Sequence, residues 1–198
     1  MEKQTTSARK EVFSVLRDFS IILAVVTVLF VFAVRLVGVD GSSMYPTLMD
    51  KDYMLLLSNV VSQDYDRGDV VVLTVPEFSS SPIVKRIIAT EGDLVDIDFS
   101  TGDVYVNGER LDEAYISEKI WVQYADATDL PATVPDGCVF VLGDNRNHSA
   151  DSRYAPIGMV DTRRIMGRVL GIALPGQKTD IEGNVIGGRD FSRIGGIS

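Results

Sequence analysis

The sixteen residues from Phe19 to Val34 carry no charge and are nearly all apolar, which constrains the fold more than any other feature. A helix that spans a bilayer needs about 20 residues. Arg35 can extend its side chain to the membrane surface, which carries the predicted span on to Val39. We therefore predict a transmembrane helix over residues 19–39. A cleaved signal peptide is the rival interpretation, but the run is long for one, and no Ala-x-Ala-like site follows it.

Basic residues predict the orientation of this helix. Four of them precede the apolar run, and after Arg35 the next is Lys51. Lys and Arg near a span tend to stay in the cytoplasm, so we expect residues 1–18 to be cytoplasmic and the chain from residue 40 onward to lie outside. That outer part holds 14 Lys and Arg against 25 Asp and Glu, a net charge near −11. Such a charge argues against nucleic acid as a partner.

Short β-type segments recur after residue 40. Seven runs have strand length, and Gly-containing turns separate them; they are 53–57, 69–75, 82–88, 94–98, 103–106, 138–142 and 167–174. No run there has a helical period, so we expect a mainly β domain over residues 40–174. Cys138 is expected to be a small buried residue. The Gly-rich, charged segment 175–198 is expected to be a flexible tail.

A polar turn with two adjacent hydroxyls follows the apolar run and reads Gly41-Ser-Ser-Met-Tyr-Pro-Thr-Leu48. Proline fixes its own φ, and Gly41 can adopt backbone angles that are closed to other residues. The turn is therefore expected to be a rigid bend that presents a serine as a nucleophile. A solvated loop that merely joins an anchor to a domain is the alternative.

Lys85 lies in a second informative stretch, Ile83-Val-Lys-Arg-Ile-Ile88. In a strand, Ile83, Lys85 and Ile87 share one face. Desolvation between isoleucines lowers the pKa of a lysine, which suits it as a general base near neutral pH. A lysine on an exposed edge strand is the alternative. Only the fold can bring Lys85 to the serines of the polar turn.

A third stretch, from Gly143 to Tyr154, is dense in Asp, Asn, Arg and Ser. This density is typical of a hydrogen-bonded network that positions a neighbouring base, and a solvated turn after Leu142 is the alternative. His148 and Cys138 are the single residues of their kinds. A zinc site is therefore not expected, and His148 is expected to be a bystander.

In this order the motifs resemble those of the bacterial type I signal peptidases, over roughly residues 15–172. The resemblance is carried by the anchor and the polar turn, Arg67-Gly-Asp-Val-Val71, Lys85-Arg86, Glu91-Gly-Asp93, and Gly143-Asp-Asn-Arg146 with Ser149, Asp151, Ser152 and Arg153. It implies a serine endopeptidase with an antiparallel β catalytic domain of the signal-peptidase and LexA-like type. One N-terminal helix would hold that domain in the plasma membrane.

The resemblance also implies a role for each matching residue. Ser43, directly before Met44, is the expected nucleophile, and its backbone N–H is expected in the oxyanion hole. Lys85 is the expected general base, and Ser149 is expected to orient it. Gly41 stands where some members carry a Ser or Thr hydroxyl in the oxyanion hole, which leaves the Ser43 amide as the main expected donor. Four charged residues are expected to support the site, namely Arg86, Asp144, Asp151 and Arg153.

The implied reaction is hydrolysis of a peptide bond through a serine ester, with no cofactor or metal. The expected partners are membrane lipid and secretory preproteins with small residues at the first and third positions before the cut. Met44 and Ile87 are expected to line the substrate pocket. Ser43 follows Val39 closely, so the nucleophile is expected near the outer membrane surface, where a signal peptide ends. The alternatives are a self-cleaving Ser–Lys protein of the repressor type and a membrane-tethered β domain for binding or scaffolding.

Overall fold

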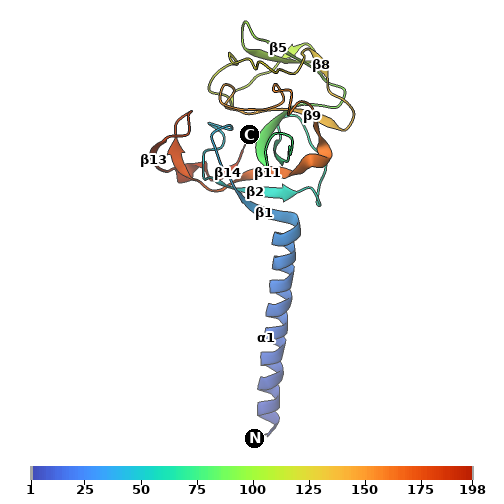
Figure 1. The fold of residues 1–198 in the computed structure, drawn as a ribbon. Coiled ribbons are helices and arrows are strands. Elements are labelled where there is room, and N and C mark those ends of the chain that lie inside the picture. Colours follow the sequence, from blue (N-terminus) through green and yellow to red (C-terminus); the bar gives the residue numbers. More distant parts are fainter. Residues whose placement is uncertain (1, 198) are drawn as a thin grey trace.

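One long helix and one β domain make up the chain (Figure 1). The computed structural model describes residues 2–197. Helix α1 (Glu2–Val28) continues into the short π-helical turn η1 (Leu29–Ala33). Within them, Glu11–Ala33 spans 23 residues with a mean hydropathy of 2.3, and none of it is buried. At about 1.5 Å per residue this segment can cross a hydrocarbon core of about 30 Å, so its length and composition suit a membrane anchor.

The helical segment ends at Ala33, so the predicted span over residues 19–39 is wrong at its C-terminal end. Val34–Gly38 instead form strand β1, which pairs antiparallel with β2 (Tyr53–Ser58). Val37 packs against a buried cluster of the domain. Pairing with β2 satisfies the backbone groups that another helical turn would have used, and the valines favour a strand. The β domain therefore begins at Val34 instead of residue 40.

The larger sheet has eight strands, all paired antiparallel, in the order β1-β2-β11-β3-β4-β9-β10, with β14 also paired to β11. The strands not yet introduced are β3 (Val70–Leu73), β4 (Ile83–Thr90), β9 (Cys138–Leu142), β10 (Val160–Asp161), β11 (Ile165–Leu174) and β14 (Gly195–Gly196). β4 lies between β3 and β9 and is buried from Lys85 to Ala89. Lys85 is therefore not on an exposed edge strand.

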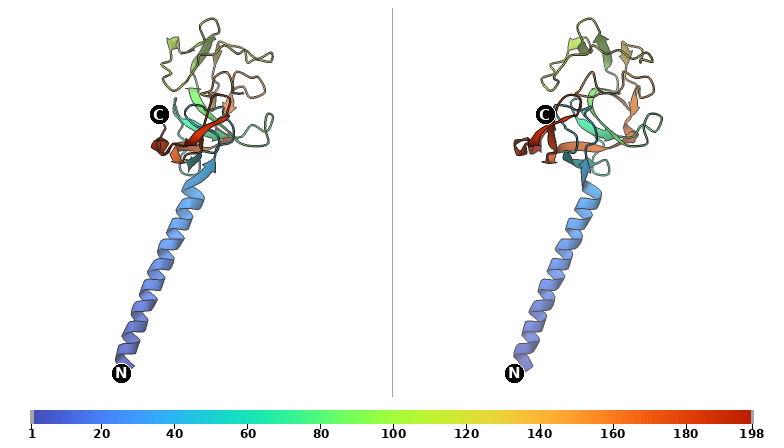
Figure 2. Two further views of the ribbon diagram at one scale, coloured as in Figure 1. Left: turned by 90° about the vertical axis from the view of Figure 1, so that its left-hand side faces the viewer. Right: turned by 60° about the vertical axis from the view of Figure 1, so that its left-hand side comes forward.

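A smaller sheet lies at the end of the domain that is furthest from α1 (Figures 1 and 2). Its strand order is β7-β6-β5-β8. The bounds are β5 (Leu94–Asp98), β6 (Asp103–Val106), β7 (Glu109–Arg110) and β8 (Ala132–Thr133). Asn107 and Gly108 turn the chain from β6 to β7 with φ angles of +55° and +81°. This is the conformation that an Asn-Gly turn favours.

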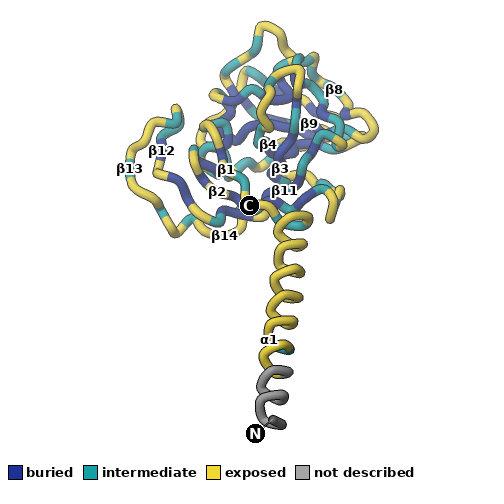
Figure 3. The backbone as a smooth tube through the Cα atoms, turned by 60° about the horizontal axis from the view of Figure 1, so that its bottom comes forward, coloured by how far each residue is buried: buried dark blue, intermediate teal, exposed yellow. Residues whose placement is uncertain are grey.

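Three buried clusters fill the β domain, whereas α1 is exposed along nearly all of its described side chains from Glu11 onward (Figure 3). One cluster joins the smaller sheet to β9 through residues such as Val95 and Phe140. A second contains Met44 and Leu48, which come from the chain between β1 and β2. The polar turn is therefore anchored in the core. Cys138, expected to be buried, is partly buried at the start of β9.

The chain after β11 has regular structure, so the predicted flexible tail is wrong for residues 175–197. β12 (Gln177–Thr179) and β13 (Val185–Arg189) form a hairpin, and the 3-10 turn η3 (Phe191–Arg193) leads into β14. Composition does not reveal the specific contacts that fix this segment. A second 3-10 turn, η2 (Thr162–Arg164), precedes β11. Between β1 and residue 197 there is no α-helix, as predicted.

Candidate active site

Ser43 lies in the loop of residues 40–52 between β1 and β2, which we name the serine loop. Gly41 has a φ of +103°, and its amide donates a hydrogen bond to Oδ1 of Asp50 at 2.8 Å. Met44 and Leu48 are 1% and 0% exposed. These contacts form the bend that the Gly and Pro pattern predicted. The side chain of Ser43 is left partly exposed at that bend.

Lys85 reaches the serine loop from β4. Its Nζ lies 2.9 Å from Oγ of Ser43, although the two residues are 42 positions apart in the chain. The same amine donates to the carbonyl oxygen of Val84 at 2.8 Å. Lys85 is only 3% exposed. The fold thus brings together the hydroxyl and the amine that sequence analysis singled out.

Burial lowers the pKa of Lys85 from its usual 10.5 to about 8. Desolvation of the ammonium is the largest cause, because charge is less favourable away from water. The carboxylates of Asp151 and Asp144 act in the opposite direction, and the guanidinium of Arg153 adds to the lowering. A neutral amine is therefore populated at mildly alkaline pH. Only the neutral form has a lone pair that can take a proton from a serine.

Arg86 and Asp144 form a buried bidentate ion pair beside Lys85. The guanidinium donates from Nε to Oδ1 at 2.9 Å and from Nη2 to Oδ2 at 2.8 Å. The two side chains are 3% and 0% exposed. Arg86 also donates to the carbonyl of Gly68, and the hydroxyl of Thr47 donates to Asp144 at 2.5 Å. This network ties β4 to the serine loop.

Asp151 and Arg153 form the second buried pair. Arg153 donates from Nε and Nη2 to the two carboxylate oxygens of Asp151, each at 2.8 Å. Asp151 also accepts from the amide of Gly143 at 3.1 Å, and Arg153 donates to the carbonyl of Arg146 at 2.6 Å. The stretch from Gly143 to Tyr154 is therefore a hydrogen-bonded network and not a solvated turn.

Ser149 lies close to the serine loop but does not bond to Lys85. Its hydroxyl is buried and has no hydrogen-bond partner among the described residues. A Cβ added to Gly143 would be 2.5 Å from the Cβ of Ser149 and 2.5 Å from the carbonyl oxygen of Ser43. Gly143 therefore permits the close approach of these two serines. The expected role of Ser149 in orienting Lys85 stays a prediction.

The backbone of Ser43 supplies one further feature of the site. Its carbonyl accepts from the amide of Asn145 at 3.0 Å, but none of the hydrogen bonds found among residues 2–197 uses the Ser43 amide. That amide is therefore left without a hydrogen-bond acceptor in this part of the chain. Met44 and Ile87, expected to line a substrate pocket, are core residues with 1% and 0% exposed. Ile87 lines a cavity of about 200 Å³ together with residues such as Arg67 and Tyr115.

Four further residues, not assigned to the site from the sequence, belong to the network of polar contacts around Ser43 and Lys85. Asn145 donates from Nδ2 to a carbonyl of the serine loop at 3.0 Å. Arg146, which is buried, pairs with Glu113 at 2.5 Å, and the ring of Tyr115 lies 4.0 Å from the guanidinium carbon of Arg86. Asn145 and Arg146 were detectable, because they belong to the Gly-Asp-Asn-Arg motif. Glu113 and Tyr115 come from the long connection between β7 and β8, where no motif marks them.

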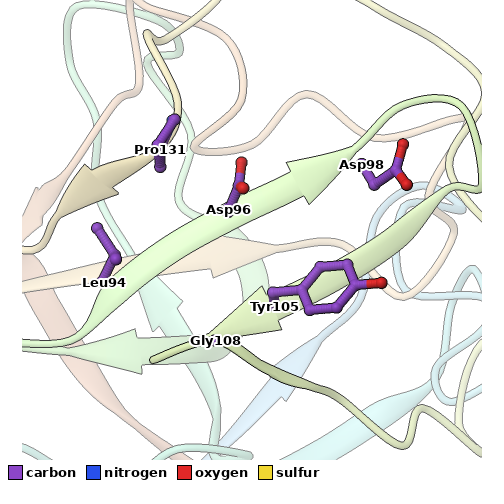
Figure 4. A pocket seen from close by; sticks show the side chains of 6 residues that line it. All are labelled: Leu94, Asp96, Asp98, Tyr105, Gly108 and Pro131. Carbon is purple, nitrogen blue, oxygen red and sulfur yellow. The ribbon is translucent and has the colours of Figure 1, made fainter.

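A separate hollow of about 560 Å³ lies on the smaller sheet (Figure 4). Its lining residues are Leu94, Asp96, Asp98, Tyr105, Gly108 and Pro131. It contains neither a serine nor a lysine, so we place the candidate active site at Ser43 and Lys85. The described residues contain no cluster of His, Cys, Asp and Glu arranged to hold a metal ion. His148 is exposed.

Known proteins resemble most of the chain. The family model described as signal peptidase, peptidase S26, matches residues 12–174. The chain is 34% identical over 174 residues to signal peptidase I of Bacillus licheniformis, covering 84% of this chain and 90% of that protein. It is 38% identical over 136 residues to signal peptidase I T of Bacillus subtilis (strain 168), covering 65% and 68%. A crystal structure of a signal peptidase I from Enterococcus faecalis V583 is 30% identical, with a TM-score of 0.43, covering 53% of this chain and 96% of that chain. The chain belongs to the signal peptidase family, peptidase S26.

Proposed function

We propose that this chain is a membrane-anchored serine endopeptidase that removes signal peptides from secreted preproteins, with Ser43 as nucleophile and Lys85 as general base. The observation that carries the proposal is the 2.9 Å contact between Nζ of Lys85 and Oγ of Ser43, made by a lysine that is 3% exposed. Family membership supports the same reaction. The scaffold and repressor alternatives receive no support from the family match.

In the first half of the reaction, the lone pair of neutral Lys85 takes the proton of the Ser43 hydroxyl as Oγ attacks the scissile carbonyl carbon. As negative charge develops on the carbonyl oxygen, the amide of Ser43 donates a hydrogen bond to it. One such donor is worth about 3 kcal/mol in the transition state. The carbon–nitrogen bond then breaks, and Lys85 returns its proton to the leaving amine. An ester between the signal peptide and Ser43 remains.

In the second half, the neutral amine of Lys85 takes a proton from water as the water oxygen attacks the ester carbonyl. The carbon–oxygen bond to Ser43 breaks, and Lys85 gives the proton back to Oγ. The products are the signal peptide with a free carboxylate and the mature protein. The reaction consumes one water molecule, and the enzyme returns to its starting state.

The surrounding charged residues have positioning roles in this proposal. Asp144 holds Arg86 beside Lys85 and also binds Thr47 of the serine loop. Asp151 and Arg153 fix the stretch that begins at Gly143. Ser149 would orient the amine of Lys85 when the hydroxyl of Ser43 is engaged in the ester, because its own hydroxyl is buried and unpartnered.

We infer that the N-terminus faces the cytoplasm and that the β domain lies outside. The four basic residues that precede the apolar run support this orientation. The resemblance to type I signal peptidases implies small residues at the first and third positions before the cut. Membrane anchoring supports cleavage next to a bilayer, because enzyme and substrate would meet in two dimensions at a raised effective concentration.

The test is cleavage of a precursor that ends its signal peptide in Ala-x-Ala, using the full chain in detergent or vesicles. Ser43→Ala and Lys85→Ala should each lower kcat by about a thousandfold or more while the fold is retained, because each removes one half of the dyad. Lys119→Ala removes an exposed lysine on the distal part of the domain and is the matched control. Wild-type rates in Ser43→Ala or Lys85→Ala would refute the proposed mechanism.

A further inference from the structure

We propose that the C-terminal segment, residues 175–196, is a brace that holds the serine loop in place, and that Arg193 is its principal positioning residue. The segment lies beyond residue 174, where the match to the signal peptidase family model ends. Figure 2 shows this segment, in red, lying along the side of the β domain. The inference rests on the proposed function, because it assigns the brace a role in keeping Ser43 within reach of Lys85.

The first contact of the brace is centred on Asp52, at the end of the serine loop. The side chain of Asp52 is 0% exposed. Arg193 donates to both carboxylate oxygens, from Nη1 at 3.0 Å and from Nη2 at 2.7 Å. Asp52 also accepts from the amide of Gly176 at 2.7 Å and from the amide of Met49 at 2.8 Å. One buried carboxylate thus binds both ends of the C-terminal segment to the serine loop.

Arg193 also connects to the residues around the dyad. Its Nη2 donates to the backbone oxygen of Thr47 at 3.2 Å. The side chain of Thr47 donates to Asp144, and Asp144 pairs with Arg86, the neighbour of Lys85. A continuous series of hydrogen bonds therefore runs from the C-terminal segment to β4. Removing the side chain of Arg193 would therefore free the backbone of Thr47 from one of these hydrogen bonds.

The second contact is made by the turn between β12 and β13. Asn145 donates from Nδ2 to the carbonyl of Ser42 at 3.0 Å and to that of Ile181 at 2.7 Å, so it bridges the serine loop and the hairpin. A Cβ added to Gly183 would lie 3.3 Å from the Cβ of Ser42. Asp180 fixes the turn by accepting from the amide of Asn184 at 2.8 Å. The turn therefore packs against the residue that precedes Ser43.

The serine loop needs external support because it has no strand or α-helix of its own. Its position depends on its buried side chains, on contacts with the stretch from Gly143 to Tyr154, and on contacts with the C-terminal segment. Misplacing a nucleophile by about 1 Å can lower a rate by roughly a hundredfold. Loosening the brace should therefore slow the chemical step and leave substrate binding nearly unchanged.

The principal experiment compares Arg193→Ala with Arg189→Ala in the full chain. Arg189 is an exposed arginine of β13, and its side chain has no hydrogen bond or ion pair among the described residues, so it is the matched control. We expect Arg193→Ala to lower kcat roughly tenfold, with KM changed less than about twofold. Amide hydrogen exchange should quicken in residues 40–52 and stay unchanged in β9. Arg193→Lys should recover only part of the rate, because lysine keeps the positive charge but cannot make the two parallel hydrogen bonds of the guanidinium to Asp52.

A second pair of variants tests the hairpin contact should Arg193→Ala fail to fold. Gly183→Ala introduces a methyl group against Ser42 at a residue with a φ of +91°, whereas Gly188→Ala introduces one into open space. Gly183→Ala should lower kcat and quicken exchange in the serine loop, and Gly188→Ala should do neither. The brace is refuted if Arg193→Ala and Gly183→Ala have the same kcat and the same hydrogen exchange as Arg189→Ala and Gly188→Ala. It is also refuted if they raise KM and leave kcat unchanged. If the wild type cleaves no precursor, the proposed function fails, whereas hydrogen exchange still decides whether the brace exists.

Discussion

Lys85 and Arg86 are neighbours in β4 and are both buried, but only Arg86 has a carboxylate partner. Arg86 binds Asp144 through two hydrogen bonds. Lys85 contacts the hydroxyl of Ser43 and the carbonyl of Val84, and no carboxylate of the described residues lies within ion-pair distance of it. Burial of the ammonium is therefore not offset by a salt bridge. This difference gives one basic residue a structural role and the other a lowered pKa.

The first prediction concerns the pH dependence of the rate. In the proposed mechanism Lys85 accepts the proton of Ser43 only when it is neutral. The value of kcat/KM should therefore rise about tenfold per pH unit below the pKa of Lys85, which is about 8, and should level off above it. The measurement is cleavage of an Ala-x-Ala precursor between about pH 5 and pH 9.5.

The control for this profile is His148→Gln. Histidine is the side chain that most often titrates near neutral pH, and His148 is the single one in the chain. The variant should reproduce the wild-type profile, because His148 is exposed and is not part of the dyad. A rate that stays flat across this range would exclude Lys85 as the base.

The second prediction concerns stability. The difference between an ordinary lysine pKa of 10.5 and about 8 corresponds to roughly 3 kcal/mol of unfavourable burial when the amine is charged. Lys85→Met keeps a similar length without the charge. It should therefore raise the free energy of unfolding by up to about 3 kcal/mol near pH 7 while abolishing cleavage.

The sign of the pH effect provides the check on this prediction. Between about pH 8 and 10.5, the unfolded chain binds a proton at Lys85 that the folded chain has released. The free energy of unfolding of the wild type therefore rises with pH in this window. Denaturant titrations should show the advantage of Lys85→Met shrinking from pH 8 to 10.5. A constant difference between the two proteins would contradict the lowered pKa.

The third prediction concerns Gly143. Gly143→Ala places a methyl group against the side chain of Ser149 and 2.5 Å from the carbonyl oxygen of Ser43. Because the serine loop must shift to relieve this contact, kcat should fall by roughly a hundredfold. The double variant Gly143→Ala with Ser149→Ala removes the hydroxyl but leaves the contact with the backbone of Ser43, so the rate should stay low. A kcat within about twofold of the wild type in Gly143→Ala would show that the site tolerates this displacement.

Much of the β domain was predictable because its strands carry a local pattern. All seven predicted runs contain a strand, and the turn glycines Gly68, Gly92, Gly108 and Gly137 all have positive φ. Such residues report on their own backbone conformation. The burial of Lys85 follows the same logic, since Ile83 and Ile87 flank it on its own face of the strand.

The two ends of the β domain were not predictable, because tertiary contacts decide their structure. Val34–Gly38 continues an apolar helical pattern, and pairing with β2 turns it into a strand. The segment after Leu174 is polar and rich in glycine, and the pair of partly buried Arg193 with buried Asp52 orders it. These two residues are 141 positions apart, and no local pattern connects them.

The residues of the candidate site also fall into a group that the sequence identified and a group that it did not. Ser43, Lys85 and the charged residues of the Gly143 stretch lie in compact motifs, so a resemblance could identify them. Glu113 and Tyr115 belong to a connection without any motif, and only the fold brings them to Arg146 and Arg86. Such partners become apparent only when the burial of a guanidinium requires a counterion or an aromatic face.

Strand β1 begins at the residue that follows the last residue of η1, so no flexible linker separates the apolar helix from the catalytic domain. In a bilayer, any tilt of α1 must therefore swing the whole domain with it. Hydrophobic mismatch is relieved partly by tilting, and a change of membrane thickness would then alter the height of Ser43 above the lipid.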